Sequence, residues 1–383
     1  MFKILQEKNV RMMTWLASED RSLKKDCLDG VDVKVLFELC REHELCGVVA
    51  SHIIADGIEG LPDYWLEEYC RERERLTFLK EKTLKICAVM REAGIPMVIL
   101  KNGGIMTDIV ADAAACPMED IDSFVRKNDF FRAHQILIDN GFVFRFRSEY
   151  EREELESAFA DGSTEYYIDM PDGGQMWFEL SWRAVAGRWI RPDKEPTCDE
   201  LFERFYYSNG TDVGILSPED NLLQVCVHTA KHSYVRAPGL RLHLDVDRIV
   251  SNKQIDWQVF LDRVEKAHLK TAVYYSLLIP KTLFSTPIPD EVLNRLKPKR
   301  AKARRIEKLL KKSGLLHPKG KKFSRLQFLR FQTSLYDSPR DALKVIYPSY
   351  EWYKEKYEIK CPIALPYYVV LRIFDLVGIR KKK

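Results

Sequence analysis

Residues 96–125 read PMVILKNGGIMTDIVADAAACPMEDIDSFV, and we expect the rest of the chain to be arranged around them. Within it, residues 97–100 form a short apolar run. Gly94 and Pro96 precede the run, and an Asn-Gly-Gly sequence at residues 102–104 follows it. A short apolar run between such residues predicts a buried strand that ends in a glycine turn.

Two aspartates stand on a second predicted strand, which covers residues 120–125. Because successive strand side chains point to opposite faces, Asp120 and Asp122 lie on one face and Ile121 lies on the other. Two like charges this close repel each other. A divalent cation such as Mg²⁺ offsets the repulsion, since it prefers hard carboxylate oxygens. An exposed edge or turn without function is the alternative interpretation of the same pattern.

A third carboxylate follows on a later predicted strand. Residues 175–182 read QMWFELSW after the tight-turn sequence PDGG. Glu179 stands there among aromatic residues, where an unpaired charge is costly. A neighbouring strand that carries Glu179 to the face of Asp120 and Asp122 completes a carboxylate triad for a metal. We expect these three carboxylates to converge on one coordination sphere, with no Lys or Arg paired to them.

These motifs resemble the nucleotidyltransferase superfamily, which has the DNA polymerase beta-like fold, and more closely the bacterial family of uncharacterised nucleotidyltransferases. The family pattern runs L-K-G, then R-P-M-x-D-I-D-x-x-V, then a helix that ends in glycine-aromatic, then an acid-L-H-W strand. The resemblance covers roughly residues 1 to 290. The matching segments are LK at 100–101, PMEDID at 117–122 with Val125, GF at 141–142, ELSW at 179–182, LSPED at 216–220 and HTAKH at 228–232.

Three positions depart from the family pattern. Asn102 stands between Lys101 and the first glycine, Cys116 stands where an arginine is usual, and Ser181 replaces the histidine. The carboxylates are kept, whereas some groups that contact phosphate in the family are changed. Metal binding is therefore better supported by the residues than full activity.

The resemblance implies a metal-dependent nucleotidyltransferase that moves a nucleoside monophosphate from an NTP to a hydroxyl acceptor. Asp120, Asp122 and Glu179 would be the catalytic residues and would hold Mg²⁺ or Mn²⁺. Glu179 would also help to deprotonate the acceptor hydroxyl. Two rival hypotheses are a catalytically inactive nucleotide or metabolite sensor of the same fold, and an adaptor that binds a polyanion or a membrane surface.

The expected nucleotide-binding residues come from two segments. Glycine allows a backbone to approach phosphates closely, and the lysine before the glycines supplies a point charge. A helix that begins with the start signal SPED after Leu216 places two histidines, four residues apart, on one face. A zinc site and hydrogen bonds between helices are the alternative roles of these histidines. The expected nucleotide-binding residues are Lys101, Gly103, Gly104, His228, Lys231 and His232.

The composition is that of a large globular chain with a sizeable core. Its 383 residues are 46% hydrophobic, which is enough for one or two domains. The start lacks a secretory signal, and no uncharged apolar run is as long as the roughly eighteen residues that suggest a membrane-spanning helix. The nine cysteines are scattered without a C-x-x-C pair, which favours reduced thiols. We expect a cytoplasmic protein.

We expect an α+β fold, in which helical segments precede and follow a small mixed sheet with flanking helices. A long amphipathic pattern over residues 64–92 ends at a glycine and predicts a helix before the sheet. The expected parts are an N-terminal helical segment at 1–93, a nucleotidyltransferase-like core at 94–215, a helical domain at 216–295 and a basic, amphipathic C-terminal extension at 296–383.

A basic segment follows at residues 295–330, with fifteen Lys and Arg and one acid, Glu307. Such a segment is usually a solvated face, and attraction of nucleic acid or anionic lipid is the alternative. Residues 365–379 are apolar and aromatic, and a basic sequence ends the chain. Arg372 and Asp375 argue against a spanning helix, so this stretch docks either on the core or on a membrane surface.

Overall fold

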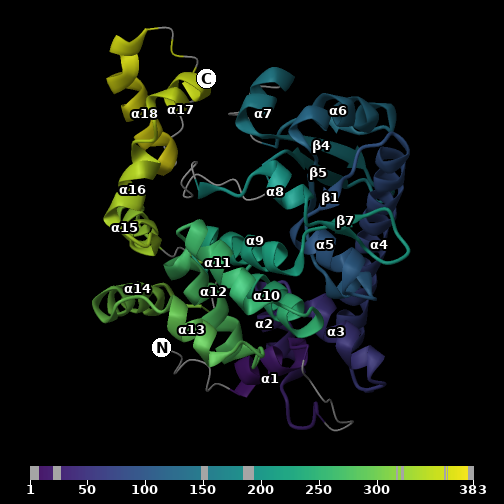
Figure 1. Ribbon diagram of the computed structural model, residues 1–383. Coiled ribbons are helices and arrows are strands. Elements are labelled where there is room, and N and C mark those ends of the chain that lie inside the picture. The colour runs from purple at the N-terminus through teal and green to yellow at the C-terminus, as the bar shows by residue number, and fades with distance from the viewer. Residues whose placement is uncertain are drawn as a thin grey trace.

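A computed structural model describes most of the chain, including the whole sheet and the candidate site. In the part that it describes, helices surround one mixed seven-stranded sheet (Figure 1). The α+β fold expected from the sequence is confirmed. The described residues are 8–19, 27–147, 154–183, 194–315, 318–320, 323–357, 359 and 361–377.

The strand order in the sheet is β3-β4-β5-β2-β1-β7-β6. Strand β2 runs parallel to β5 and antiparallel to β1, while β1 runs parallel to β7. The acidic strand and the strand of Glu179 are therefore direct neighbours near the middle of the sheet. The strands are β1 (Val98–Ile99), β2 (Asp120–Phe124), β3 (Val143–Phe144), β4 (Ser163–Asp169), β5 (Gln175–Ser181), β6 (Tyr206–Tyr207) and β7 (Gly214–Ile215).

Helices precede the sheet and connect its strands. The long amphipathic pattern forms α4, which ends just before Gly94, a residue whose φ of +74° favours glycine. The helices before the sheet are α1 (Lys8–Ala17), α2 (Val33–Glu42), α3 (Cys46–Ala55) and α4 (Asp63–Glu92). The helices between strands are α5 (Lys101–Asp108), α6 (Phe130–Asp139), α7 (Leu155–Asp161) and α8 (Cys198–Phe202).

The chain after the sheet is helical in its described residues. Each of these helices is too short or too polar to span a lipid bilayer. They are α9 (Pro218–Lys231), α10 (Arg241–Asn252), α11 (Trp257–Lys266), α12 (Lys270–Leu283), α13 (Asp290–Leu296), α14 (Arg300–Ser313), α15 (Arg325–Leu335), α16 (Pro339–Ile346), α17 (Tyr350–Tyr357) and α18 (Leu365–Val377).

The two faces of the sheet pack against different parts of the core. Ile121 and Phe178 point into the main hydrophobic core, which extends from α1 to α15. Phe124 points to the opposite face and packs with Leu100 and Phe202 in a smaller cluster beneath α8. Burial of each such side chain stabilises the fold by about 1.5–3 kcal/mol. The division into four parts stays a prediction, since the main core is continuous across them.

A helix, and not the predicted glycine turn, follows β1. Gly103 and Gly104 lie inside α5, with their φ angles in the ordinary helical range. A Cβ atom on Gly104 would lie 2.6 Å from the carbonyl oxygen of Ile99, and one on Gly103 would lie 2.7 Å from the Ile99 side chain. Both glycines are therefore needed because α5 packs closely against β1.

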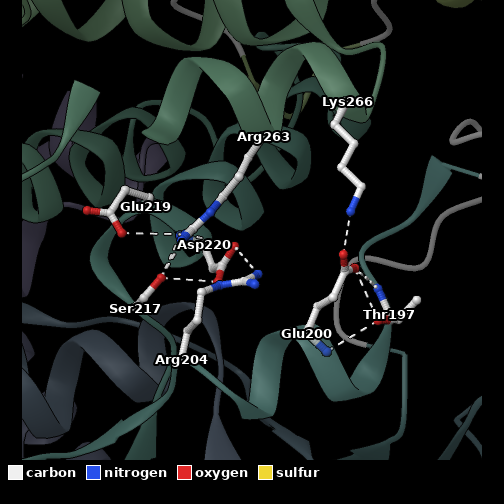
Figure 2. A network of polar contacts seen from close by, with 8 residues as sticks. All are labelled: Thr197, Glu200, Arg204, Ser217, Glu219, Asp220, Arg263 and Lys266. Atoms are coloured by element: carbon white, nitrogen blue, oxygen red, sulfur yellow. Dashed lines mark hydrogen bonds and ion pairs between the residues drawn. The ribbon is translucent and has the colours of Figure 1, made fainter. Parts of the chain in front are cut away.

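An ion-pair network anchors the start of α9 (Figure 2). Asp220 is 2% exposed and accepts hydrogen bonds from Arg204 at 2.8 Å, while Arg263 lies 3.0 Å from its other oxygen. Lys266 on α11 pairs with Glu200 on α8. The network joins α8, α9 and α11, and so it fixes the direction in which α9 runs toward the carboxylate face.

The predicted basic segment forms the end of α13, α14 and the start of α15. Part of it is used within the fold, since Lys302 donates to Thr271 at 2.8 Å and Arg295 pairs with Glu265 at 3.1 Å. Residues 316, 317, 321 and 322 of the segment lie outside the described residues. The exposed basic residues of α14 include Arg304, Arg305, Lys308, Lys311 and Lys312.

Candidate active site

The three predicted acidic residues share one face of the sheet. In the parallel pairing of β2 and β5, Asp122 lies directly opposite Glu179, and Asp120 lies opposite Trp177. Side chains of directly opposite residues point to the same side of a sheet. On β4 a fourth carboxylate, Glu165, lies opposite Glu179 and so points to this face as well.

Lys101 neutralises the most buried of these carboxylates. Its ammonium donates to Asp122 Oδ1 at 2.5 Å, and the two side chains are 25% and 11% exposed. Burial raises the pKa of Asp122 to about 7, Lys101 opposes that rise, and Glu179 and Asp120 add to it. Burial acts to lower the pKa of Lys101, but the surrounding carboxylates, Asp122 foremost, raise it above its ordinary value.

Arg147 neutralises the outer carboxylates. Its guanidinium lies 2.6 Å from Asp120 and 3.1 Å from Glu165, so it bridges β2 and β4. It also lies over the ring of Trp177, 5.4 Å from the centroid. Burial acts to lower the pKa of Arg147, whereas Asp120 and Glu165 together raise it. The carboxylate face therefore carries two cations of its own.

The expectation that no Lys or Arg is paired with these carboxylates is wrong. Lys101 and Arg147 hold Asp122 and Asp120, respectively. Among the residues that the structure describes, no three His, Cys, Asp or Glu side chains are grouped closely enough to hold a metal ion. The physical reason is that closely spaced negative charges attract nearby cations, and here the side chains of Lys101 and Arg147 are those cations.

The backbone at Lys101 is strained in a way that aims its side chain. Its φ is +51°, in the left-handed region that costs a non-glycine residue about 1–2 kcal/mol. Its N–H donates to Gln224 Oε1 on α9 at 3.3 Å. The strand-to-helix transition therefore fixes Lys101 from two sides, with its ammonium on the carboxylate face.

Two of the three departures from the family pattern contact each other. The Asn102 amide donates to the carbonyl of Pro117 at 2.9 Å, and the Cys116 thiol donates to the Asn102 carbonyl at 3.2 Å. Burial raises the pKa of Cys116 to about 12, so the thiol stays neutral. The third departure, Ser181, donates to the backbone carbonyl of Ser123 at 2.8 Å. All three substituted side chains thus support backbone around the site.

Arginines from other helices hold the segment in which the family arginine is replaced. Their guanidinium groups donate to backbone carbonyls on either side of Cys116, on the approach to β2. The segment therefore keeps cationic partners, although they come from α4 and α10 and were not predicted from the sequence. The pairs are Arg75 with Met118 at 2.7 Å, Arg248 with Ala115 at 2.5 Å, and Arg241 with Pro117.

The predicted histidines lie on α9, near the lysine end of the site. Their ring centroids are 4.8 Å apart, and Nδ1 of His232 lies 2.7 Å from the carbonyl oxygen of Ala237. Burial lowers the pKa of His228 well below its ordinary value, with a further contribution from Lys101. Burial also lowers the pKa of His232 to about 4. Both rings are therefore neutral at pH 7, and Lys231 lies exposed beside them.

One family of known proteins matches this chain over most of its length. Residues 29–285, more than half of the chain, match the model of a family described as uncharacterised nucleotidyltransferase. The chain belongs to this family. No curated protein and no solved structure matches the chain. For this nucleotidyltransferase-family protein, the match covers α2 to α12 and the whole sheet, and α13 to α18 lie outside it.

The sequence patterns did not predict some residues of the site. Glu165 and Trp177 join it only through the pairing of β4 with β5 and of β5 with β2, and Arg147 reaches it from the segment after β3, which pairs with β4. No local spacing distinguishes them from ordinary strand residues. Gln224 could have been found, because it precedes His228 by one helical turn and so shares its face.

Proposed function

We propose that this protein transfers a nucleoside monophosphate from an NTP to a hydroxyl acceptor, with Mg²⁺ or Mn²⁺ as cofactor. The observation that carries the proposal is the shared face of Asp120, Asp122 and Glu179 beside the ammonium of Lys101. Membership of the nucleotidyltransferase family supports the reaction class. The metal, the roles of the individual residues and the acceptor class are parts of the proposal.

The chemistry of the donor set fits a hard divalent cation. Asp120, Asp122 and Glu179 supply carboxylate oxygens from adjacent positions on two paired strands. These three residues would hold the metal once Lys101 and Arg147 released Asp122 and Asp120, because the present ion pairs keep the three side chains from grouping around one ion. When bound, it would stabilise charge on the triphosphate and on the attacking and leaving oxygens.

Lys101 would exchange one anionic partner for another when a nucleotide binds. Its ammonium now balances Asp122, and a triphosphate beside the carboxylates offers it a second anion. The first turn of α5 contains Gly103, and a helix start offers N–H groups without intrahelical partners to an anion; that of Lys101 already donates to Gln224. Gly104 allows this turn to sit against β1. The lysine and the helix start would together hold the phosphates.

The transfer step forms one bond and breaks one. The acceptor oxygen attacks the α-phosphorus, the bond from that phosphorus to the bridging oxygen breaks, and pyrophosphate leaves with the electron pair. Glu179 would take the proton of the acceptor hydroxyl on a carboxylate oxygen. His228, neutral at pH 7, would donate a hydrogen bond to the nucleotide phosphates, and Lys231 would supply charge at the same end. The single N–H of neutral His232 donates to the carbonyl of Ala237, so His232 would position this end of the site.

The proposal is tested with NTPs labelled at the α-phosphorus, incubated with the purified protein, Mg²⁺ or Mn²⁺ and cell extract. We expect label on a product. Asp120→Ala should eliminate the transfer because it removes a metal ligand. Glu179→Gln should slow it severely and leave nucleotide binding partly intact. Absence of label from all four NTPs would overturn the proposal, provided that the protein binds Mg²⁺-nucleotide.

An inactive sensor of the same fold is the second candidate function. The ion pairs of Lys101 with Asp122 and of Arg147 with Asp120 favour it, because they balance the carboxylates without a metal. A sensor would bind nucleotide in a calorimetric titration and produce no pyrophosphate.

The third hypothesis, a polyanion adaptor that acts through the basic segment, stays a prediction. Reversal of the Lys308 and Lys311 charges should then abolish salt-sensitive RNA binding and spare Mg²⁺ binding.

A further inference from the structure

Helix α18 exposes its apolar side and buries its arginine. Ile363, just before the helix, and four large residues within it are between 38% and 88% exposed. Their spacings of three and four residues place them on one side of the helix. Arg372 is only 7% exposed. The exposed residues are Ile363, Tyr367, Val370, Ile373 and Phe374.

The inner side of α18 packs on the aromatic residues of α17. The guanidinium of Arg372 lies over the ring of Trp352, 4.8 Å from its centroid. The ring of Tyr368 lies 5.3 Å from that of Tyr357. These contacts fix the rotation of α18 about its axis. Apolar residues lie on both sides of the helix, and those on its outer side stay exposed.

Helix α16, which packs against α18, enlarges the exposed apolar surface. Leu343 and Tyr347 are 56% and 50% exposed, and they lie four residues apart on one face. Two exposed basic residues, Arg340 and Lys344, share that part of the helix. Figure 1 shows α16, α17 and α18 together on one side of the molecule, away from α1 to α4. We call Leu343, Tyr347 and the exposed residues of α18 the outer apolar surface.

The charges around the outer apolar surface are positive. Besides Arg340 and Lys344 on α16, the chain ends in Arg-Lys-Lys-Lys at residues 380–383. Apart from the buried Arg372, residues 363–383 contain four Lys and Arg, all at 380–383, and one acid, Asp375. An anionic occupant is therefore favoured over a neutral or cationic one.

We propose that the outer apolar surface docks on the face of an anionic lipid bilayer. Tyr367 and Phe374 supply aromatic groups that suit the headgroup boundary, and Val370 supplies an aliphatic side chain for the acyl region. Basic side chains at the rim pair with anionic headgroups. The helix is too short to span the bilayer, so it lies in the plane of the interface. This proposal does not depend on the catalytic one, because the carboxylate face is formed by other elements.

The test is co-sedimentation of the full-length protein with lipid vesicles. We expect binding to vesicles of phosphatidylcholine with phosphatidylglycerol and little binding to phosphatidylcholine alone. Tyr367→Ser with Phe374→Ser should lower the bound fraction about tenfold or more. Arg340→Glu with Lys344→Glu should remove much of the salt-sensitive part of the binding.

Matched variants keep this test falsifiable. Phe131→Ser with Val143→Ser removes apolar residues of similar exposure from α6 and β3, and it should leave vesicle binding unchanged. Circular dichroism and Tm should show that each variant folds. Equal binding by the α18 variant and the unaltered protein would overturn the proposal. So would complete loss of binding on reversal of the α14 charges with α18 intact, or self-association through α18 without vesicle binding.

Discussion

Asp122 is the residue at which burial and charge oppose each other most strongly. It lies in the sheet between Lys101 on one side and Glu179 on the other. Burial favours its neutral form, whereas the ammonium of Lys101 favours the carboxylate. A carboxyl group in this balance changes its protonation near neutral pH. Metal binding should therefore depend on pH through this residue.

The first prediction is that Mn²⁺ affinity falls as the pH is lowered below about 7. A metal needs the deprotonated carboxylate, so protons compete with it below the pKa of Asp122. The affinity should fall by up to about tenfold per pH unit in that range and level off above it. Electron paramagnetic resonance of free Mn²⁺ measures the effect. Asp122→Asn should weaken binding and remove this pH dependence, and a flat profile in the unaltered protein would contradict the prediction.

The second prediction concerns Lys101→Met, measured at a pH above the pKa of Asp122 in that variant, which loss of the ammonium raises. Removal of the ammonium frees Asp122, so Mn²⁺ without nucleotide should bind about tenfold more tightly. Nucleotide should bind more weakly, since a phosphate partner is lost. Lys253→Met is the matched control, because Lys253 is 23% exposed and pairs with Asp108 at 2.6 Å. An unchanged Mn²⁺ affinity in Lys101→Met would show that the ammonium does not compete with the metal.

At the scale of elements, the position of α5 against β1 determines where Lys101 lies. The third prediction is that Gly104→Ala lowers the free energy of unfolding by about 2–3 kcal/mol, because its Cβ would meet the carbonyl of Ile99. It should also weaken nucleotide binding, since α5 must shift. Gly57→Ala is the control. Its Cβ meets no atom within 4 Å, and the strain at its φ of +65° should cost about 1 kcal/mol without affecting the nucleotide. Urea denaturation compares the two variants, and equal losses would contradict this account.

The elements differ in how far the sequence could predict them. Alternation along 120–125 placed Asp120 and Asp122 on one face, because strand geometry is local. The Asn-Gly-Gly sequence predicted a turn wrongly, because glycine marks both turns and close helix packing, and only the contact with Ile99 distinguishes them. The pairing of Arg147 with Asp120 joins residues 27 positions apart, and local patterns carry no information about such contacts.

At the scale of the whole molecule, Arg248 connects three distant parts of the chain. It is 1% exposed, pairs with Glu19 at 3.1 Å and donates to the carbonyl of Ala115 just before the acidic strand. The helices after the sheet are thereby tied both to the N-terminal helices and to the site. The candidate site therefore depends on contacts outside the sheet itself.

The fourth prediction is that Arg248→Met lowers the free energy of unfolding by about 3 kcal/mol, because it leaves the carboxylate of Glu19 without this partner. Arg41→Met is the control. Arg41 is 59% exposed in its pair with Glu38, so its loss should change stability by about 0.5 kcal/mol or less. Chemical denaturation of both variants measures the difference. A small effect of Arg248→Met would show that the buried pair contributes little.

Transfer from NTPs labelled at either the α- or the γ-phosphorus distinguishes nucleotidyl transfer from the alternatives. The unaltered protein, Asp122→Asn and Glu165→Gln are compared with Mn²⁺ present. Glu165 is the matched acid, since it lies on the same face and pairs with Arg147, but it is outside the proposed metal site. The account predicts α-label in a product, γ-label in pyrophosphate, loss of both with Asp122→Asn and near-normal transfer with Glu165→Gln. Product that carries γ-label, or transfer that survives Asp122→Asn, would contradict it.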